Sequence, residues 1–282
     1  MPMAMRRERL IKFYEDKTGK KIDLDNPTLF TEKIQWMKLY YKNPDMSRCV
    51  DKIEFKKFIR ERLGEGYTAE LIDIWNSPRE VDLKKLPEKF VIKSNCQSDG
   101  KDIYIVKNKA HLDIEAVEKD IKEHWFDAKR TLCNSFCRAY YEVKPKVLIE
   151  EYIEEFDGKV NDYKLFCFQG VPKFFYVAED HFKNGENVDD YPITFFDLNW
   201  NAMDVKYGKH ERNVKVKKPK HLVEMIDNAK KLSKGFPFVR VDFFDTEEQL
   251  YLAELTFYPG GGMTPYYPEA FDREMGEWLG IP

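Results

Sequence analysis

Two runs of β-branched and aromatic residues near the C-terminal end constrain this chain more than any other feature. Residues 238–244 and 250–257 each predict a strand, and the polar stretch 245–249 between them predicts a hairpin. Both runs alternate charged or polar residues with aliphatic ones, as expected where one face of a sheet packs on a core. We therefore expect a hairpin with one apolar and one charged face.

The charged face of this hairpin carries side chains suited to a charged ligand. Side chains two residues apart point to the same face, so Arg240 lies beside Asp242, and Glu254 lies beside Thr256. Carboxylates on neighbouring strands suit Mg²⁺, which takes a few carboxylate oxygens and completes its octahedron with phosphate and water. Arg240 would complement those phosphates. The alternative is a solvated sheet face held by a cross-strand ion pair.

The whole-chain composition excludes several classes of protein. The 282 residues are 43% hydrophobic and 34% charged with a net charge of −3, so neither nucleic acid nor a membrane is an expected partner. The five cysteines lack the spacing of a disulfide framework, and Cys133 and Cys137 lack further ligands for zinc. We expect reduced thiols in a cytoplasmic protein, without a signal peptide or a transmembrane segment.

The N-terminal part predicts helices. Asn26 and Pro27 predict the cap and first turn of an amphipathic helix that ends before residue 44. Residues 47–64 predict a second, single helix. Lys52 lies near its start, where a cation opposes the helix dipole. A bound anion would relieve this conflict, and an ordinary surface lysine is the alternative.

Lys93 interrupts the apolar run of a short strand predicted over 90–95, and a buried ammonium there needs an anionic partner. The small polar loop 96–101 and a strand over 102–106 follow. Backbone N–H groups and hydroxyls in such a loop can close over phosphates. An ordinary hairpin loop has the same composition and is the alternative.

A glycine-rich loop follows the second strand of the C-terminal hairpin. Gly260, Gly261 and Gly262 would let the backbone approach a ligand closely, although three glycines also suit a flexible turn. Tyr258 before them, like the tyrosines at 266 and 267, is a candidate for contact with an acceptor substrate. A packed aromatic cluster is the alternative interpretation of these tyrosines.

Taken in order, these residues resemble those of an ATP-grasp enzyme, and more narrowly of the TupA-like branch, associated with teichuronopeptide and other surface-polysaccharide biosynthesis. Segments 30–36 and 86–95 carry the narrower likeness, which runs from about residue 25 to the C-terminus. It implies an α+β class and an ATP-grasp fold, in which two α+β subdomains clamp ATP. The implied division is a mostly helical region at 1–85 and subdomains at 86–150 and 151–282.

The resemblance also implies a nucleotide site. The implied ATP contacts are Lys52, Lys93, Ser94, Ser98, Gly100, Glu150, Glu151, Tyr152, Ile153 and Asp162. The two lysines would contact the phosphates. The side chain of Glu150, the carbonyl of Glu151 and the N–H of Ile153 would form the adenine hinge. Asp162 would face the ribose or the substrate.

The same likeness assigns the metal and the transferred phosphoryl group. The implied Mg²⁺ ligands are Asp242, Glu254 and Thr256, and the implied catalytic residues are Arg240 and Lys164. Thr256 stands where many ATP-grasp enzymes have Asn, although a hydroxyl can also bind Mg²⁺ or its water. The loop over the phosphates has few glycines, and its Asp99 would be unfavourable there unless it points away or pairs with Lys101.

The activity that follows is that of an ATP-dependent carboxylate–amine ligase, which forms an amide through an acyl phosphate. The resemblance suggests that it attaches an amino acid or amine to a uronic-acid-containing surface polysaccharide or its precursor, in association with polysaccharide-assembly enzymes. The alternatives are a small-molecule or sugar kinase of the same fold and a non-catalytic nucleotide-binding partner. The cofactors would be ATP and Mg²⁺.

Overall fold

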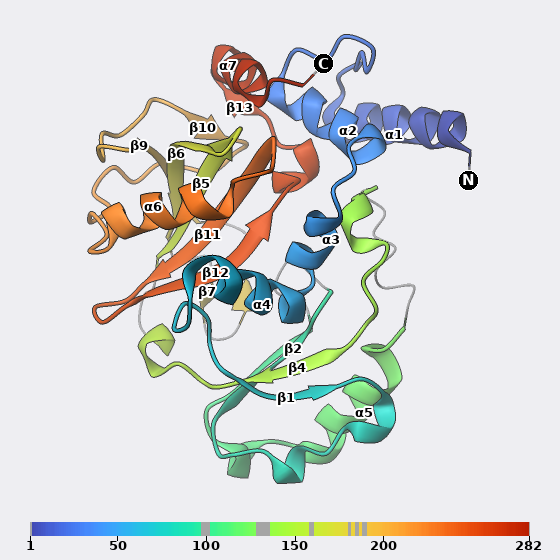
Figure 1. The fold of residues 1–282 in the computed structure, drawn as a ribbon, viewed down its shortest axis with the longest axis vertical. Coiled ribbons are helices and arrows are strands. Elements are labelled where there is room, and N and C mark those ends of the chain that lie inside the picture. The colour runs from blue at the N-terminus through green and yellow to red at the C-terminus, as the bar shows by residue number, and fades with distance from the viewer. Residues whose placement is uncertain are drawn as a thin grey trace.

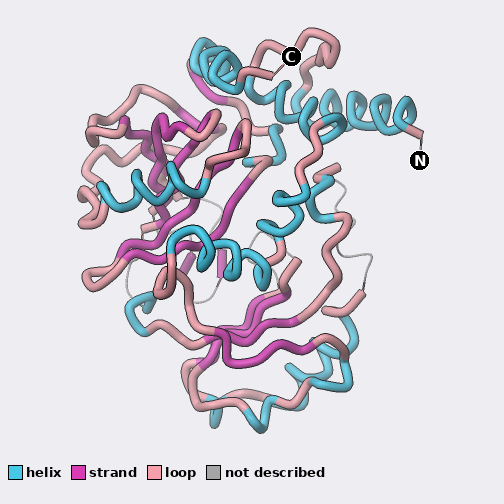
Figure 2. The backbone as a smooth tube through the Cα atoms, in the orientation of Figure 1, coloured by secondary structure: helices cyan, strands magenta, loops and turns pink. Residues whose placement is uncertain are grey.

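Two separate antiparallel sheets form the body of the molecule, and helices connect and cover them (Figure 1). The computed structural model describes residues 2–96, 102–127, 136–157, 161–179, 182–183, 186–187 and 191–281. The described α-helices are α1 (Met3–Thr18), α2 (Phe30–Tyr40), α3 (Pro44–Val50), α4 (Lys52–Leu63), α5 (Ile114–His124), α6 (Leu222–Leu232) and α7 (Glu269–Leu279). Figure 2 shows the strands in two distinct groups, with α3 and α4 between them.

The larger sheet has five strands in the order β12-β11-β5-β6-β9. Its strands are β5 (Asp162–Phe168), β6 (Val171–Ala178), β9 (Ile193–Asp197), β11 (Phe238–Asp245) and β12 (Leu250–Thr256). The predicted hairpin of β11 and β12 is confirmed. Helix α6 packs on β5, β6 and β11 and covers the face that carries Cys167, whose thiol lies 4.0 Å from the Ala229 carbonyl oxygen. Arg240 and Asp242 therefore lie on the other face.

The smaller sheet has four strands in the order β1-β4-β2-β3. They are β1 (Leu71–Trp75), β2 (Phe90–Ser94), β3 (Ile103–Val106) and β4 (Val147–Glu150). Apolar residues of this sheet and of α5, among them Phe90, Ile92 and Ile121, form a second hydrophobic core. Strand β1 was not predicted from the sequence, because this short edge strand has only one buried residue, Trp75.

Short elements complete the described fold. The two-residue strands are β7 (Phe182–Lys183), β8 (Glu186–Asn187), β10 (Lys206–Tyr207) and β13 (Tyr266–Tyr267). The 3-10 turns are η1 (Pro78–Glu80), η2 (Leu83–Lys85), η3 (Lys109–His111), η5 (Arg138–Tyr140), η6 (Glu154–Asp157) and η7 (Pro259–Gly262). Strands β10 and β13 pair beside the larger sheet, so residues after the glycine loop return towards β6 and β9.

Helix α2 is docked on the C-terminal helix α7 (Figure 1). The Asp272 carboxylate accepts hydrogen bonds from the Thr31 N–H at 3.0 Å and from the Thr31 hydroxyl at 2.8 Å, which satisfies donors at the start of α2. A Cβ atom added at Gly276 would lie 2.1 Å from the Thr28 carbonyl oxygen, so only glycine permits this close approach. Helices α2 and α7 thus form one packed unit.

Two helix boundaries differ from the sequence prediction, and local hydrogen bonds explain both. Asn26 and Pro27 do not start α2, because the Glu32 side chain accepts from the backbone N–H groups of Thr28 and Leu29 and sets the start at residue 30. Residues 47–64 do not form one helix either. Asp51 leaves the helical conformation, and its carboxylate caps α4 by accepting from the Ile53 N–H at 2.9 Å.

Candidate active site

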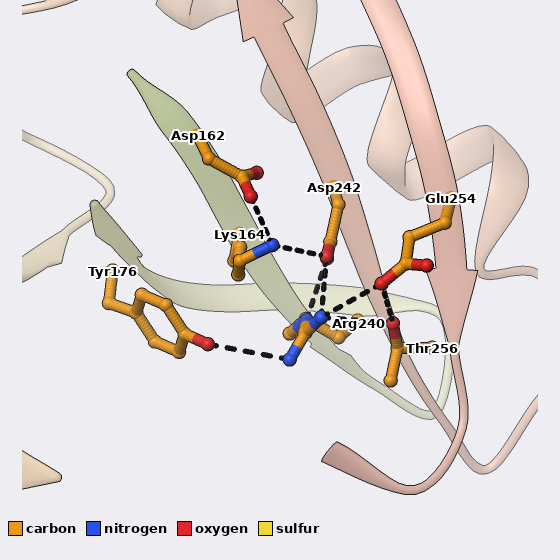
Figure 3. A network of polar contacts seen from close by, with 7 residues as sticks. All are labelled: Asp162, Lys164, Tyr176, Arg240, Asp242, Glu254 and Thr256. Atoms are coloured by element: carbon orange, nitrogen blue, oxygen red, sulfur yellow. Dashed lines mark hydrogen bonds and ion pairs between the residues drawn. The ribbon is translucent and has the colours of Figure 1, made fainter. Parts of the chain in front are cut away.

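The first part of the site is a group of acidic and basic side chains on the larger sheet (Figure 3). We call it the carboxylate cluster; its members are Asp162, Lys164, Arg240, Asp242, Glu254 and Thr256. The strand register aligns it, because Asp242 pairs with Glu254 on one side and with Lys164 on the other. Arg240 lies opposite Thr256 in the same way. The alternation of side chains along β5, β11 and β12 therefore brings the whole set onto one face.

Asp242 is the fully buried centre of the carboxylate cluster. Its Oδ1 accepts from Arg240 Nε at 2.7 Å, and its Oδ2 accepts from Arg240 Nη2 at 2.5 Å and from Lys164 Nζ at 2.8 Å. Burial alone would raise the pKa of Asp242, but the Arg240 and Lys164 cations lower it. The carboxylate is therefore ionised and paired, as a buried charge must be.

Lys164 joins two carboxylates. Its Nζ lies 2.5 Å from Asp162 Oδ2 and 2.8 Å from Asp242 Oδ2. Burial disfavours the ammonium, yet the two carboxylates raise the pKa of Lys164 above its ordinary value. Lys164 thus stays charged and is unsuited to act as a base.

Glu254 lies at the open side of the same cluster, with 48% of its side chain exposed. Its Oε1 lies 3.2 Å from Arg240 Nη2 and accepts from the Thr256 hydroxyl at 2.9 Å. The surrounding protein and the Asp242 carboxylate raise the pKa of Glu254. Two carboxylates from neighbouring strands therefore converge on one point, and in the structure the group at that point is a guanidinium nitrogen (Figure 3).

This arrangement fits a Mg²⁺ site that phosphate completes. Among the described residues, no three His, Cys, Asp or Glu side chains are grouped to hold a metal ion by themselves. Mg²⁺ is usually held by one or two carboxylates together with substrate phosphates, so Asp242 and Glu254 are a sufficient protein donor set. Arg240 Nη2 also donates to the Thr256 hydroxyl at 3.0 Å, so the guanidinium contacts each proposed metal ligand.

The second part of the site lies on the smaller sheet and on α4. We call it the lysine cluster: Lys52, Lys56, Lys93 and Glu150. The buried Glu150 carboxylate, at the end of β4, lies between two ammonium groups, with Oε1 at 2.7 Å from Lys56 Nζ and Oε2 at 2.6 Å from Lys93 Nζ. Burial opposes ionisation, but the two lysines outweigh it and lower the pKa of Glu150 to about 2.

Lys52 connects the two clusters. Its backbone N–H donates to the Asn95 carbonyl just after β2, at 3.0 Å. Burial lowers the pKa of Lys52, and the carboxylates that oppose this are Glu254 of the larger sheet and Glu150 of the smaller one. The Lys52 ammonium thus lies within electrostatic reach of both sheets.

The remaining expected nucleotide contacts lie around the end of β4 and of β2. Glu151 leaves the sheet and exchanges hydrogen bonds with Glu70, and Tyr152 lies under Lys107, whose Nζ is 6.0 Å from the ring centroid. Ile153 is buried, and its carbonyl accepts from the Phe156 N–H. The Ser94 hydroxyl is buried against the Cys96 thiol at 3.5 Å. Ser98 and Gly100 lie outside the described residues.

The glycine loop is a packed turn in the structure, with each glycine in the left-handed region: φ is 55° at Gly260, 60° at Gly261 and 64° at Gly262. The loop contacts α2 on one side and Tyr207 on the other. Tyr258 is buried, and its carbonyl accepts from the Gly261 N–H at 2.8 Å. Tyr266 is buried and Tyr267 is 51% exposed.

Sequence reasoning missed two residues of the site. Lys56 follows Lys52 by one helical turn, and this i, i+4 spacing was the available signal that both face the same side. Tyr176 pairs with Lys164 across β5 and β6, and its hydroxyl lies 3.4 Å from Arg240 Nη1. The strand register that places it beside the arginine could not be predicted from the sequence.

The lysine cluster thus lies on β2, β4 and α4, and the paired carboxylates and the arginine lie on β5, β11 and β12 of the other sheet. The chain belongs to the TupA-like ATP-grasp family, whose profile, described as TupA-like ATPgrasp, matches residues 32–280. This match confirms the predicted family and the α+β ATP-grasp fold. A search of curated proteins gave no significant match.

Several solved structures are similar to this chain. The D-alanine–D-alanine ligase of Bacillus anthracis is 21% identical, with a TM-score of 0.42 over 75% of this chain and 58% of that one. The corresponding enzyme of Helicobacter pylori is 17% identical, with a TM-score of 0.45 over 83% and 59%. The L-amino acid ligase of Bacillus licheniformis is 12% identical, with a TM-score of 0.44 over 76% and 42%. The chain thus spans about three fifths of the D-alanine–D-alanine ligases.

Proposed function

We propose that this protein is an ATP-dependent carboxylate–amine ligase that forms an amide through an acyl phosphate. One observation carries the proposal: the lysine cluster has an excess of positive charge, and the carboxylate cluster has an excess of negative charge. The lysine cluster sets three ammonium groups against one carboxylate. The carboxylate cluster sets three carboxylates against two cations. A nucleotide triphosphate with Mg²⁺ complements both.

The proposed binding mode assigns the phosphates to the lysine cluster. Lys93 and Lys56 share one carboxylate, so the group keeps a net positive charge that a polyphosphate can neutralise. Lys52, between the sheets, would contact the same phosphates. The backbone of Glu151 and Ile153 leaves the sheet at the end of β4, which supports the proposed adenine hinge there. We propose that residues 86–150 and 151–282 clamp the nucleotide between them, with 1–85 as the helical region.

The proposed metal site uses Asp242 and Glu254, with Thr256 as a ligand or as a hydrogen-bond partner of a bound water. Mg²⁺ held there would neutralise phosphate oxygens and favour transfer of the terminal phosphoryl group. Lys164 forms ion pairs with both the Asp162 and the Asp242 carboxylates. Arg240 already reaches the same point, so its guanidinium can contact the transferred group when the carboxylates take a metal.

The proposed reaction has two steps. A substrate carboxylate oxygen forms a bond to the terminal phosphorus of ATP, the bond to the bridging oxygen breaks, and ADP leaves. An amine then attacks the acyl carbon, phosphate leaves with the bonding electron pair, and the amine loses a proton. The protein contributes by positioning and by charge neutralisation, without a covalent intermediate on the enzyme.

We further propose, from the family, that the carboxylate belongs to a uronic acid of a surface polysaccharide or its precursor and that an amino acid or amine is attached. Association with polysaccharide-assembly enzymes belongs to the same proposal. We also propose a cytoplasmic, reducing location, because the five cysteines lack the spacing of a disulfide framework. Among the described residues, no helix combines the length and hydrophobicity needed to span a bilayer.

The direct test supplies purified protein with ATP, Mg²⁺ and a panel of uronates and amines, and measures ADP release together with product mass. An amide product that requires both substrates supports the ligase. A phosphorylated product without amide would replace it with a kinase, and ATP binding without turnover would replace it with a non-catalytic role. The Asp242→Asn, Glu254→Gln double variant should lose turnover, whereas Asp204→Asn, a surface acid paired with Arg212, should not.

A further inference from the structure

A fully buried lysine on α2 holds the glycine loop. Lys38 has no exposed surface, and its Nζ donates to the Gly261 carbonyl at 2.5 Å and to Gln35 Oε1 at 3.0 Å. Lysine is almost never fully buried without a compensating interaction, because removing an ammonium from water is costly. A methionine-sized apolar side chain would fill the same space at lower cost. The position therefore requires the donor itself.

Gln35, one turn earlier on α2, holds the same loop. Its Nε2 donates to the Gly261 carbonyl at 3.0 Å and to the Gly262 carbonyl at 2.9 Å. A Cβ atom added at Gly262 would lie 2.4 Å from Gln35 Nε2, so the loop packs too closely against α2 for any side chain at this position. In a trans peptide the N–H points opposite to the carbonyl. The N–H of Gly262, in the same peptide as the Gly261 carbonyl, therefore points away from α2.

The other side of the loop faces a row of aromatic rings that leads to Arg240. A Cβ added at Gly260 would lie 2.2 Å from the Tyr207 hydroxyl oxygen. The Tyr207 ring stacks on Tyr176 with centroids 5.9 Å apart, and the Tyr176 hydroxyl lies 3.4 Å from Arg240 Nη1. The loop thus lies between α2 and this row, so a shift of the loop alters the surroundings of the guanidinium.

We propose that Lys38 is a positioning residue for the carboxylate substrate. Its buried ammonium fixes the glycine loop, and the substrate binds beside Arg240, between the Gly262 N–H and the rings of Tyr207 and Tyr176. The inference rests on the proposed ligase function. Lys38 acts through the loop and does not contact the reacting atoms. It follows that α2, which carries none of the expected nucleotide contacts, determines how the carboxylate substrate is held.

The test compares Lys38→Met with Thr31→Val. Methionine keeps the volume of Lys38 and removes the donor. Valine keeps the shape of Thr31 and removes its hydrogen bond to Asp272, which weakens the docking of α2 without touching the loop. In Lys38→Met the KM for the carboxylate substrate should rise about tenfold or more, while the KM for ATP stays within about twofold. Thr31→Val should leave both within about twofold. Equal rises in both constants, or the same split in Thr31→Val, would overturn the proposal.

A second readout does not depend on turnover. Amide hydrogen exchange over residues 257–264 should accelerate about tenfold or more in Lys38→Met and stay unchanged in Thr31→Val, because only the first variant releases the loop carbonyls. Gln35→Leu, which removes the other donor, should accelerate the same peptide. Unchanged exchange in both loop variants would refute the positioning role. If the wild-type protein forms no amide, the ligase proposal fails, and the exchange comparison alone then decides whether Lys38 sets the loop.

Discussion

The lysine cluster and the carboxylate cluster both bury charged side chains, but their excess charges have opposite signs. In the first, one buried carboxylate, Glu150, is shared by two lysines, and the excess charge is positive. In the second, Asp242 is shared by Arg240 and Lys164, and the additional acids make the excess negative. Each cluster is internally paired, so the sheet that carries it is stable, yet each keeps a charge of one sign for a ligand. This difference supports the proposal that the two halves bind different parts of one metal–nucleotide complex.

The largest effect should come from Asp242→Asn. The change removes one negative charge from the proposed metal site and one partner from each of two cations, so kcat for ADP release should fall about 10³-fold. Loss of a buried partner should also lower stability by about 3 kcal/mol or more, which urea denaturation measures. Asp204→Asn provides the control on the surface. Turnover within tenfold of wild type in a folded Asp242→Asn variant would exclude this carboxylate from the chemistry.

Next in size is the stability that Glu150 contributes. The folded pKa of about 2 lies below the ordinary 4.5, so the stabilisation is fully present above pH 4.5 and is lost as the pH falls towards 2. At pH 6 Glu150→Gln should be less stable than wild type by an amount on the order of 3 kcal/mol, and the gap should shrink below pH 4.5. Urea denaturation across pH measures this.

The exposed pair of Glu154 with Lys89 supplies the matched control, because solvent screens it. Glu154→Gln should change stability by less than about 0.5 kcal/mol at each pH. A gap between wild type and Glu150→Gln that widened in acid would contradict the assigned direction of the pKa shift.

Lys93→Met should weaken ATP binding by about 30-fold, the cost of one charge-assisted contact to phosphate, and should change kcat much less. Lys89 is exposed and directly precedes β2, and the Lys89→Met variant should bind ATP with the wild-type affinity. Calorimetric titration measures both. Equal losses in the two variants would show that general surface charge, rather than the lysine cluster, holds the phosphates.

The smallest effect is expected at Tyr176. Its hydroxyl lies 3.4 Å from Arg240 Nη1, a long hydrogen bond, while its ring supports the row of aromatic side chains. Tyr176→Phe should lower kcat by no more than about threefold, and Tyr176→Ala by considerably more. Comparable losses in both variants would mean that the hydroxyl, and not the ring, is what the site requires.

The sequence was sufficient to predict the hairpin and the pairs of side chains that share a face on each strand, Arg240 with Asp242 and Glu254 with Thr256. It did not predict the irregularity in strand register between Asp242 and Phe243, which places Glu254 rather than Ala253 opposite Asp242. The lysines of β2 and α4 were recognisable only by their order along the chain, because no periodicity indicates which distant element they meet.

Other features depend on tertiary packing that local patterns do not encode. Lys38 and Gln35 look like ordinary polar residues of an amphipathic helix, and their burial follows from the docking of α2 on α7 and on the glycine loop. The break at Asp51 depended on a cap that competes with helix continuation. Composition showed that the glycine loop is permissive, whereas its single left-handed conformation results from its neighbours.

The central claim is that the two clusters bind opposite parts of one nucleotide–metal complex. Its most direct test is the affinity for ATP, measured calorimetrically with and without Mg²⁺, in wild type, Lys93→Met and Asp242→Asn. Lys93→Met should lose affinity in both conditions, and Asp242→Asn should lose it only when Mg²⁺ is present. An Asp242→Asn loss of the same size without Mg²⁺, or no effect of Lys93→Met in either condition, would contradict the account.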